Sequence, residues 1–246
     1  MIRKIEKILK LDDFALEAIY TPAMVNIIYL AFIITCVFFD LGVSVNDFVW
    51  WKVALDVLGA FSVAVVFTRF VMEIFRGTSK LFENINYGKD RLHFPTTSIL
   101  LHNDKSISQD LKKRVREKLK SIYNINLLSK TKEEADEMEA RRTAKDAVAS
   151  IRQIVSDSKD VMTDRKLRRY DAYRNFLGGA LCCFIVSVIL LIVDYNKTGV
   201  CNMVLVSALL IYIIIIVVDY LLTKSAAVDY AETLITTFDK IENDEA

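Results

Sequence analysis

Four long apolar blocks constrain the fold of this chain more than any other feature of its sequence. They cover residues 23–39, 53–75, 176–193 and 203–222. A helix needs roughly 20 apolar residues to cross the hydrocarbon core of a bilayer, and each block is close to that length. None of them shows the alternation that a membrane β-strand requires, and a helix satisfies its backbone hydrogen bonds internally. We therefore expect an all-α integral membrane protein with four transmembrane helices.

The distribution of Lys and Arg predicts the orientation of these helices. Residues 1–22 contain four such residues and residues 76–174 contain 23, whereas the connections after the first and third blocks contain only Lys52 and Lys197. Because positively charged flanks stay on the cytosolic side of a membrane, we expect both termini and the central insert in the cytosol. The expected location is a bacterial inner (plasma) membrane, crossed several times.

These features divide the chain into five expected segments. They are a cytosolic amphipathic segment (1–22), a transmembrane hairpin (23–75), a cytosolic helical insert (76–174), a second transmembrane hairpin (175–223) and an acidic cytosolic tail (224–246). Apolar residues gather on one face of the first segment. This segment therefore either lies on the inner leaflet or packs against the insert.

The insert carries 23 basic and 15 acidic residues, a net charge of +8. Its first predicted helix covers about 108–123, with Ser106 or Ser108 as the cap. The apolar stripe of this helix consists of Leu111, Val115, Leu119 and Ile122. Its six basic residues, which include Lys112 and Arg116, are expected to occupy the remaining faces.

A second helix is predicted over about 132–160, with Thr131 and Glu134 as a capping box. At 1.5 Å per residue it would be roughly 40 Å long. Its apolar positions are Ala144, Val148, Ile151 and Val155, followed by Met162. We expect the stripes of the two insert helices to press together in a hairpin. A polar helical stretch over 164–175 then leads into the third block.

Charged residues inside the apolar blocks are costly and call for a partner. We expect Arg69 of the second block to pair with Asp219 of the fourth, and Glu73 is an alternative partner for Arg69 one helical turn away. Such a pair either belongs to a gate or ion pathway, or fixes how two helices meet. Arg near a helix end can also extend to the membrane surface.

Polar residues crowd the start of the third block and form candidate sites at the membrane boundary. These residues are Arg168, Arg169, Arg174 and Asn175. Gly178 and Gly179 follow them and allow a kink or a close contact between helices.

No catalytic, cofactor-binding or metal-binding motif occurs in the sequence. P-loop, dinucleotide-binding, zinc-protease and nucleophile-elbow patterns are all absent. His93 and His102 have no third ligand at suitable spacing, so we expect no metal site. Because the other motifs are absent as well, we expect no cofactor and no enzymatic activity. The net charge of +1 gives no reason to expect a nucleic-acid partner. The basic insert is either a solvated surface near anionic lipid or a site for phosphate-rich ligands or nucleic acid.

One run of features resembles a known group of proteins. It comprises RLHFPTTSILL (91–101), KTKEEAD (130–136), AVASIR (147–152) and YDAYRNFLGG (170–179). In these segments the chain resembles small four-span bacterial membrane proteins, some of them effectors of anti-phage defence. The resemblance covers about residues 85–180 and implies a protein that damages the host membrane when triggered.

Two functions are therefore expected to compete. The first is an oligomeric membrane-perturbing or pore-forming effector, controlled through its insert. Four helices cannot enclose a wide pore alone, so this effector would be a homo-oligomer in the lipid bilayer. The second is a membrane anchor or scaffold whose insert recruits a soluble cytosolic partner.

Overall fold

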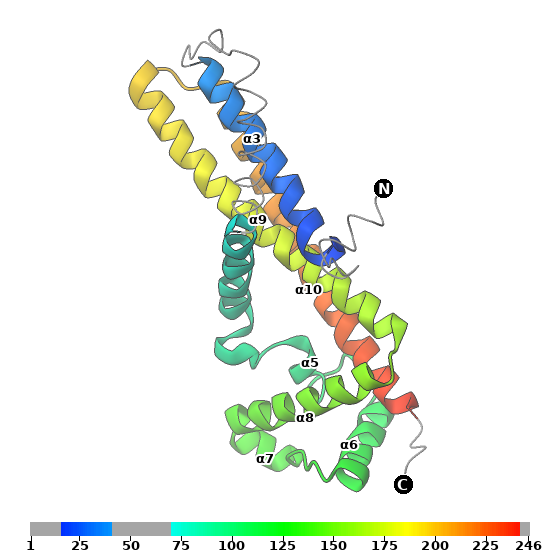
Figure 1. Cartoon of the computed structure of the whole chain (residues 1–246). Coiled ribbons are helices and arrows are strands. Elements are labelled where there is room, and N and C mark those ends of the chain that lie inside the picture. Colours follow the sequence, from blue (N-terminus) through cyan, green and yellow to red (C-terminus); the bar gives the residue numbers. More distant parts are fainter. Residues whose placement is uncertain (1–15, 41–69, 242–246) are drawn as a thin grey trace, which may run out of the picture. The chain divides into compact units, whose positions relative to one another are not determined.

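The structure is a computed structural model that describes residues 16–40 and 70–241 of the 246-residue chain. All regular structure in these ranges is helical (Figure 1), which confirms the all-α prediction. The chain divides into two compact units, which we name by their composition. The apolar unit comprises Met1–Lys80 and Asp171–Leu221, and the polar unit comprises Leu81–Tyr170 and Leu222–Ala246.

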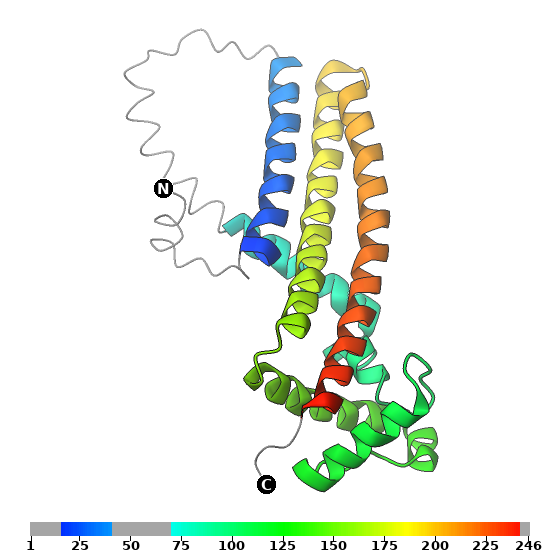
Figure 2. The ribbon, with the colours of Figure 1, turned by 90° about the vertical axis from the view of Figure 1, so that its right-hand side faces the viewer.

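The apolar unit is built from long helices. A π-helical turn, Leu16–Tyr20, precedes α3 (Thr21–Asp40), and a further helix covers residues 70–87. The other two are α9 (Val161–Thr198) and α10 (Met203–Lys240), which enter this unit with residues 171–198 and 203–221. Within this unit α3, α9 and α10 lie side by side (Figure 2).

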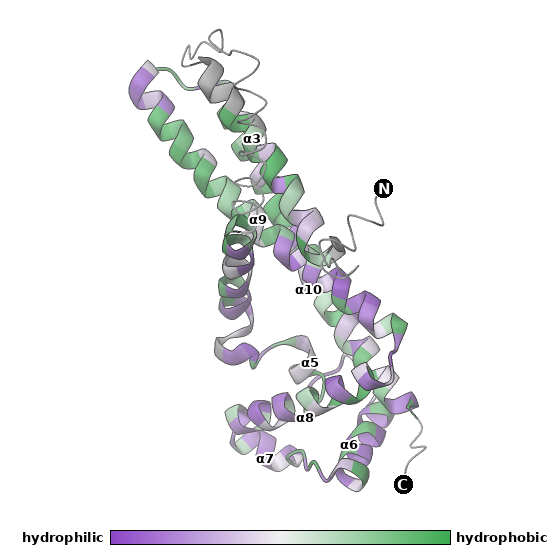
Figure 3. Ribbon diagram, in the orientation of Figure 1, coloured by the Kyte–Doolittle hydropathy of each residue, from purple (hydrophilic) through white to green (hydrophobic). Residues whose placement is uncertain are grey.

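The core of the apolar unit joins all four helices. The rings of Tyr29 and Tyr212 meet edge to face, with their centres 4.8 Å apart. The buried residues around this pair are Ala23, Ile33, Met72, Phe75, Ala180, Cys183, Leu205 and Ala208. Among the described residues, α9 and α10 are the two helices long and apolar enough to cross a membrane. Figure 3 shows the apolar stretch of α9 as mainly green ribbon. The first expected block lies on α3, and most of the second lies outside the described residues.

Gly178 and Gly179 make the close contact that the sequence predicted, and α9 continues through them without a break. A Cβ atom on Gly178 would lie only 2.0 Å from Oγ of Ser79 and 2.4 Å from the carbonyl oxygen of Phe75. A Cβ atom on Gly179 would lie 2.7 Å from Nδ2 of Asn26. The absence of side chains here therefore lets α9 pack directly on the helix over 70–87 and on α3.

Shorter helices make up most of the polar unit. They are η2 (Lys89–Arg91), α5 (Pro95–Ser98), α6 (Gln109–Tyr123), α7 (Lys130–Ala135) and α8 (Glu137–Asp157), together with the start of α9 and the end of α10. The predicted bounds and cap of α6 are confirmed, since Oγ of Ser108 accepts a hydrogen bond from the amide of Leu111. The buried core includes Tyr87, Leu92, Phe94, Ile99, Val115, Leu119, Ala144, Val148, Ile151, Val155, Tyr230, Leu234, Ile235 and Phe238.

The prediction of one long helix over 132–160 is wrong. The helix breaks at Asp136, whose extended backbone separates α7 from α8 and whose carboxylate accepts a hydrogen bond from the amide of Glu139. Thr131 lies inside α7 and caps nothing, because α7 already begins at Lys130. An Asp at the N-cap satisfies amide groups that would otherwise lack partners, which favours a new helix start at this position.

Two residues predicted to lie on apolar stripes are exposed instead. Ile122 is exposed near the end of α6, and Met162 belongs to the first turn of α9. The other predicted core positions of α8, from Ala144 to Val155, are buried as expected.

The expected cytosolic tail continues α10 as far as Lys240 and packs within the polar unit. The ring of Phe238 is fully buried and lies 5.8 Å from the ring of Tyr123. Nη2 of Arg114 lies 2.8 Å from Oδ2 of Asp239, and Nζ of Lys118 donates to the carbonyl of Phe238. The end of α10 therefore belongs to the core of this unit.

Replacing Gly178 by Ala should destabilise the apolar unit. The new methyl group would meet backbone atoms that cannot move without separating two helices, so we expect a loss of about 2 kcal/mol. Gly77→Ala is the matched control, because nothing lies within 4 Å of a Cβ atom at this helical position. The measurement is thermal unfolding of the full chain in detergent. Equal unfolding temperatures for the two variants would contradict the close contact.

Candidate functional site

Several polar side chains are buried in the apolar unit, and some of them bond to helix carbonyls. Nδ2 of Asn26 donates to the carbonyl of Pro22 at 2.9 Å and lies 3.5 Å from the carbonyl oxygen of Phe176 on α9. The hydroxyl of Ser187 donates to the carbonyl of Cys183 at 2.8 Å. Hydrogen bonds of this kind satisfy polar groups between packed helices.

Two buried carboxylates of the apolar unit differ from these residues. Asp194 of α9 and Asp219 of α10 are 2% and 4% exposed. One oxygen of each accepts no hydrogen bond from any residue within 16–40 or 70–241. Burying a carboxylate without a partner is costly, so these two are the most demanding groups in this unit.

The expected partner of Asp219, Arg69, lies outside the described residues, so the pairing stays a prediction. The alternative partner of Arg69 is described. Glu73 is largely exposed, and its Oε1 lies 3.8 Å from Nη1 of Arg76 on the same helix. Glu73 is thus next to a cation of its own helix.

Of the boundary candidates, Arg174 and Asn175 belong to the apolar unit. Nη1 of Arg174 lies 2.9 Å from Oδ1 of Asp171, and both side chains are mostly buried. Nδ2 of Asn175 donates to the carbonyl of Ala18 at 2.6 Å. Asn175 therefore fixes the chain just before α3 onto α9, which is a positioning role.

Arg168 and Arg169 lie in the polar unit, so the four candidates do not form one site. Nη2 of Arg168 lies 2.7 Å from Oδ2 of Asp164, and Arg169 is exposed. Arg168 also lines a hollow of about 600 Å³. The hollow has an apolar floor of Val155, Tyr230 and Leu234, and a rim that includes Arg152, Lys159, Asp160 and Asp164.

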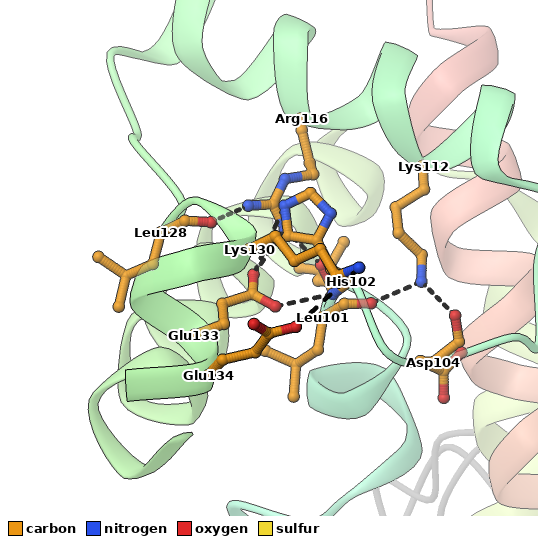
Figure 4. A network of polar contacts seen from close by, with 10 residues as sticks. Leu101, His102, Asp104, Lys112, Arg116, Leu128, Lys130, Glu133 and Glu134 are labelled. Atoms are coloured by element: carbon orange, nitrogen blue, oxygen red, sulfur yellow. Dashed lines mark hydrogen bonds and ion pairs between the residues drawn. The ribbon is translucent and has the colours of Figure 1, made fainter. Parts of the chain in front are cut away.

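The sequence did not reveal a buried polar cluster on α6 and α7 (Figure 4). Nη1 of Arg116 donates to Oε1 of Glu133 at 3.0 Å and to the carbonyl of Leu100 at 2.8 Å, while Nη2 donates to the carbonyl of Leu128. Oε2 of Glu133 accepts a hydrogen bond of 2.8 Å from the amide of His102. One ion pair thus holds two irregular segments of the polar unit against α6.

Lys112 belongs to this cluster, so the prediction that it lies on a helix face outside the apolar stripe is wrong. It is 1% exposed, and its Nζ donates to the carbonyls of Leu101 at 2.6 Å and Asp104 at 2.7 Å. At 100° per residue, Lys112 lies only about 20° from Leu119 around the helix, so its position relative to the apolar stripe could have revealed its burial.

Burial also affects the protonation of this cluster. It lowers the pKa of Lys112, because an apolar environment disfavours the charged ammonium group. It lowers the pKa of His102 as well, and the charge of Arg116 adds to that effect. Neither His102 nor any other described residue belongs to a group of three or more side chains able to hold a metal.

Comparison of the chain with protein-family models, with curated proteins and with solved structures gives no match. The resemblance to four-span membrane proteins therefore stays a proposal. The choice of candidate site residues therefore rests on the distances and the burial described above.

Removing the carboxylate of Glu133 should loosen the segments that the cluster holds. Glu133→Ala leaves the guanidinium of Arg116 largely buried without its counter-charge, so we expect a local loss of about 3 kcal/mol. Glu134→Ala is the matched control, because that neighbouring carboxylate is exposed and such changes usually cost under about 0.5 kcal/mol.

Hydrogen exchange of peptides covering residues 98–135 measures this effect. Glu133→Ala should raise the exchange rate there by about 100-fold, which corresponds to the expected loss. Unchanged protection in Glu133→Ala would show that the ion pair does not hold these segments.

Proposed function

We propose that the chain is a bacterial inner-membrane protein with four transmembrane helices, both termini and the polar insert being cytosolic. It acts as a homo-oligomer that perturbs or permeabilises the membrane, under the control of its polar unit. This function is also the one that its resemblance to defence effectors implies. The support comes from the apolar helices, from two buried carboxylates and from the continuity between the units.

The apolar faces of α9 and α10 support a lipid environment. In the most apolar stretch of each helix, only 33% and 22% of the residues are buried within the chain. A core helix of a soluble protein would be mostly buried instead. The large exposed residues recur at helical spacing and include Ile185, Ile189 and Ile192 on α9, and Leu210, Ile214, Val217 and Leu221 on α10. Continuous apolar surfaces of this kind are covered by lipid or by a partner.

The carboxylates of Asp194 and Asp219 are the observation that carries the effector proposal. A helix that only anchors a domain gains nothing from a buried carboxylate, whose cost in an apolar setting is several kcal/mol. Ionisable residues inside membrane helices mark ion pathways, proton relays or charge pairs. Asp219 lies inside the fourth apolar block and Asp194 directly follows the third, and both are buried within the chain. In an oligomer, a movement of the helices that exposes these carboxylates would attract cations into a path between subunits.

Helix continuity supports control by the polar unit. The boundaries between the units, after Lys80, Tyr170 and Leu221, all fall inside helices. Each of these helices therefore joins the two units without a flexible linker. A signal bound to the polar unit would reach the apolar unit through a helical backbone.

Induced expression in cells loaded with a membrane-potential dye tests the effector function. We expect the wild-type chain to depolarise the membrane, together with its native operon partners and trigger where these are needed. Asp219→Asn should weaken the effect because the path loses charge. Asp157→Asn, an exposed change on α8, should leave it intact. A chain that inserts normally and never depolarises the membrane, even with partners and trigger, contradicts the proposal.

The pairing of Arg69 with Asp219 has a separate test. Arg69→Asp should lower the amount of folded protein in the membrane, because it places two carboxylates at one depth. Adding Asp219→Arg to that variant should restore the charge pair and recover most of the protein. The measurement is membrane-extracted protein that elutes as a single species. No recovery at all in the double variant would show that these two residues do not pair.

A membrane anchor or scaffold is the second candidate. The polar unit favours it, because this unit has a buried core of its own and several surface hollows. A soluble protein that co-purifies with the full chain in fixed ratio, in cells that show no depolarisation, would favour the anchor over the effector.

A further inference from the structure

A second hollow in the polar unit lies beside the cluster of Figure 4, and its lining holds four cations and one carboxylate, Glu117. Its volume is about 290 Å³. Its walls include Lys112, Lys113, Arg116 and Lys120 of α6, with His102 and Asn126 on adjoining segments. At 100° per residue, the four cations fall within about 100° of one another around the helix, so they share one face.

The positive charge of this face is only partly balanced. Glu133 is bonded to Arg116, and Oε1 of Glu117 lies 3.9 Å from Nζ of Lys113. The hydrogen bonds of Lys112 go to neutral carbonyl groups instead. Among the described residues, no carboxylate lies within ion-pair distance of Lys112 or Lys120. In this partly buried setting, uncompensated positive charge attracts an anion strongly.

Donor groups also remain for such an anion. Nη1 and Nη2 of Arg116 donate to the carbonyls of Leu100 and Leu128 and to Glu133. Its Nε–H donates to no acceptor among the described residues. Asn126 lines the hollow as well, with an amide that can donate. Guanidinium, ammonium and amide donors around a small hollow are the groups that hold phosphate oxygens.

We propose that this hollow binds a phosphate group, carried either by a small phosphorylated molecule or by a phospholipid headgroup. Lys112 and Arg116 form its buried floor, and Lys113 and Lys120 attract the anion at its rim. The larger hollow beside Arg168 is less positive, because two carboxylates, Asp160 and Asp164, lie among three cations there, whereas Glu117 is the one carboxylate beside the four cations here.

The rim lysines allow a test that does not disturb the fold, because both are exposed. The full chain in a non-ionic detergent is titrated with inorganic phosphate at constant ionic strength, and its thermal unfolding is followed. We expect a saturable rise in the unfolding temperature, because a ligand that binds the folded state stabilises it. Lys113→Gln with Lys120→Gln should weaken the apparent affinity by about tenfold. Lys132→Gln with Lys145→Gln removes the same charge from exposed positions outside the hollow, and should leave the titration unchanged.

A lipid arm separates the two sources of the phosphate group. The same variants are placed in phosphatidylcholine nanodiscs with and without phosphatidic acid. Stabilisation by phosphatidic acid alone that depends on Lys113 and Lys120 assigns the site to a headgroup, whereas stabilisation by inorganic phosphate assigns it to a soluble ligand. If neither probe stabilises the chain, or if both do so equally in the two double variants, the proposed site is wrong.

Discussion

The apolar faces of α9 and α10, which the chain itself leaves largely uncovered, are the constraint on which the proposed membrane location and the organisation of the rest of the chain depend. Most of the apolar stretch of each helix is not buried by the chain itself. Water would make such faces aggregate, whereas lipid covers them at no cost. The same helices continue into the polar unit, where α10 buries Tyr230, Leu234 and Phe238 in a core of the kind that water sustains. In the proposed membrane arrangement, α10 therefore contacts lipid along its apolar stretch and belongs to a water-exposed unit beyond it.

The two units satisfy their buried polar groups by different means. In the apolar unit, Asn26 and Ser187 bond to helix carbonyls, which adds no net charge to a region of low dielectric constant. The polar unit also buries whole charges, and it balances Arg116 with Glu133 while Lys112 faces carbonyl groups. In the apolar unit, the mostly buried pair of Arg174 and Asp171, next to the boundary between the units, follows this second pattern. Asp194 and Asp219 fit neither pattern, which is why they support a functional role in the membrane and not only a role in packing.

Local patterns in the sequence predicted a good part of this fold. The structure has the predicted bounds of α6 and its Ser108 cap, which depend on residues close in sequence. It also has the predicted close contact between helices at Gly178, which depends on the small size of glycine. The break at Asp136 was missed because Thr131 and Asp136 are both good caps, and only the tertiary packing of α7 and α8 selects the second. The burial of Lys112 was missed because the basic residues of α6 were all assigned to the helix faces outside its apolar stripe. A long side chain can cross an apolar layer and still find acceptors at its far side, and here the acceptors are carbonyls of a segment about ten residues away.

The spread of Arg168, Arg169, Arg174 and Asn175 over two units could not be foreseen either, since one continuous helix carries all four.

The orientation of the α9–α10 hairpin tests the membrane proposal most directly. Cys201 is exposed in the short connection between these helices, so it reports that connection without any added label site. In a Cys36→Ser background, a maleimide that cannot cross membranes should label Cys201 in intact spheroplasts, because the connection faces outward. A cysteine introduced as Lys145→Cys on α8 should be labelled only after the membrane is permeabilised. Labelling of both positions in intact spheroplasts, or recovery of the chain as a monodisperse species without detergent, would contradict a multi-pass protein with a cytosolic insert.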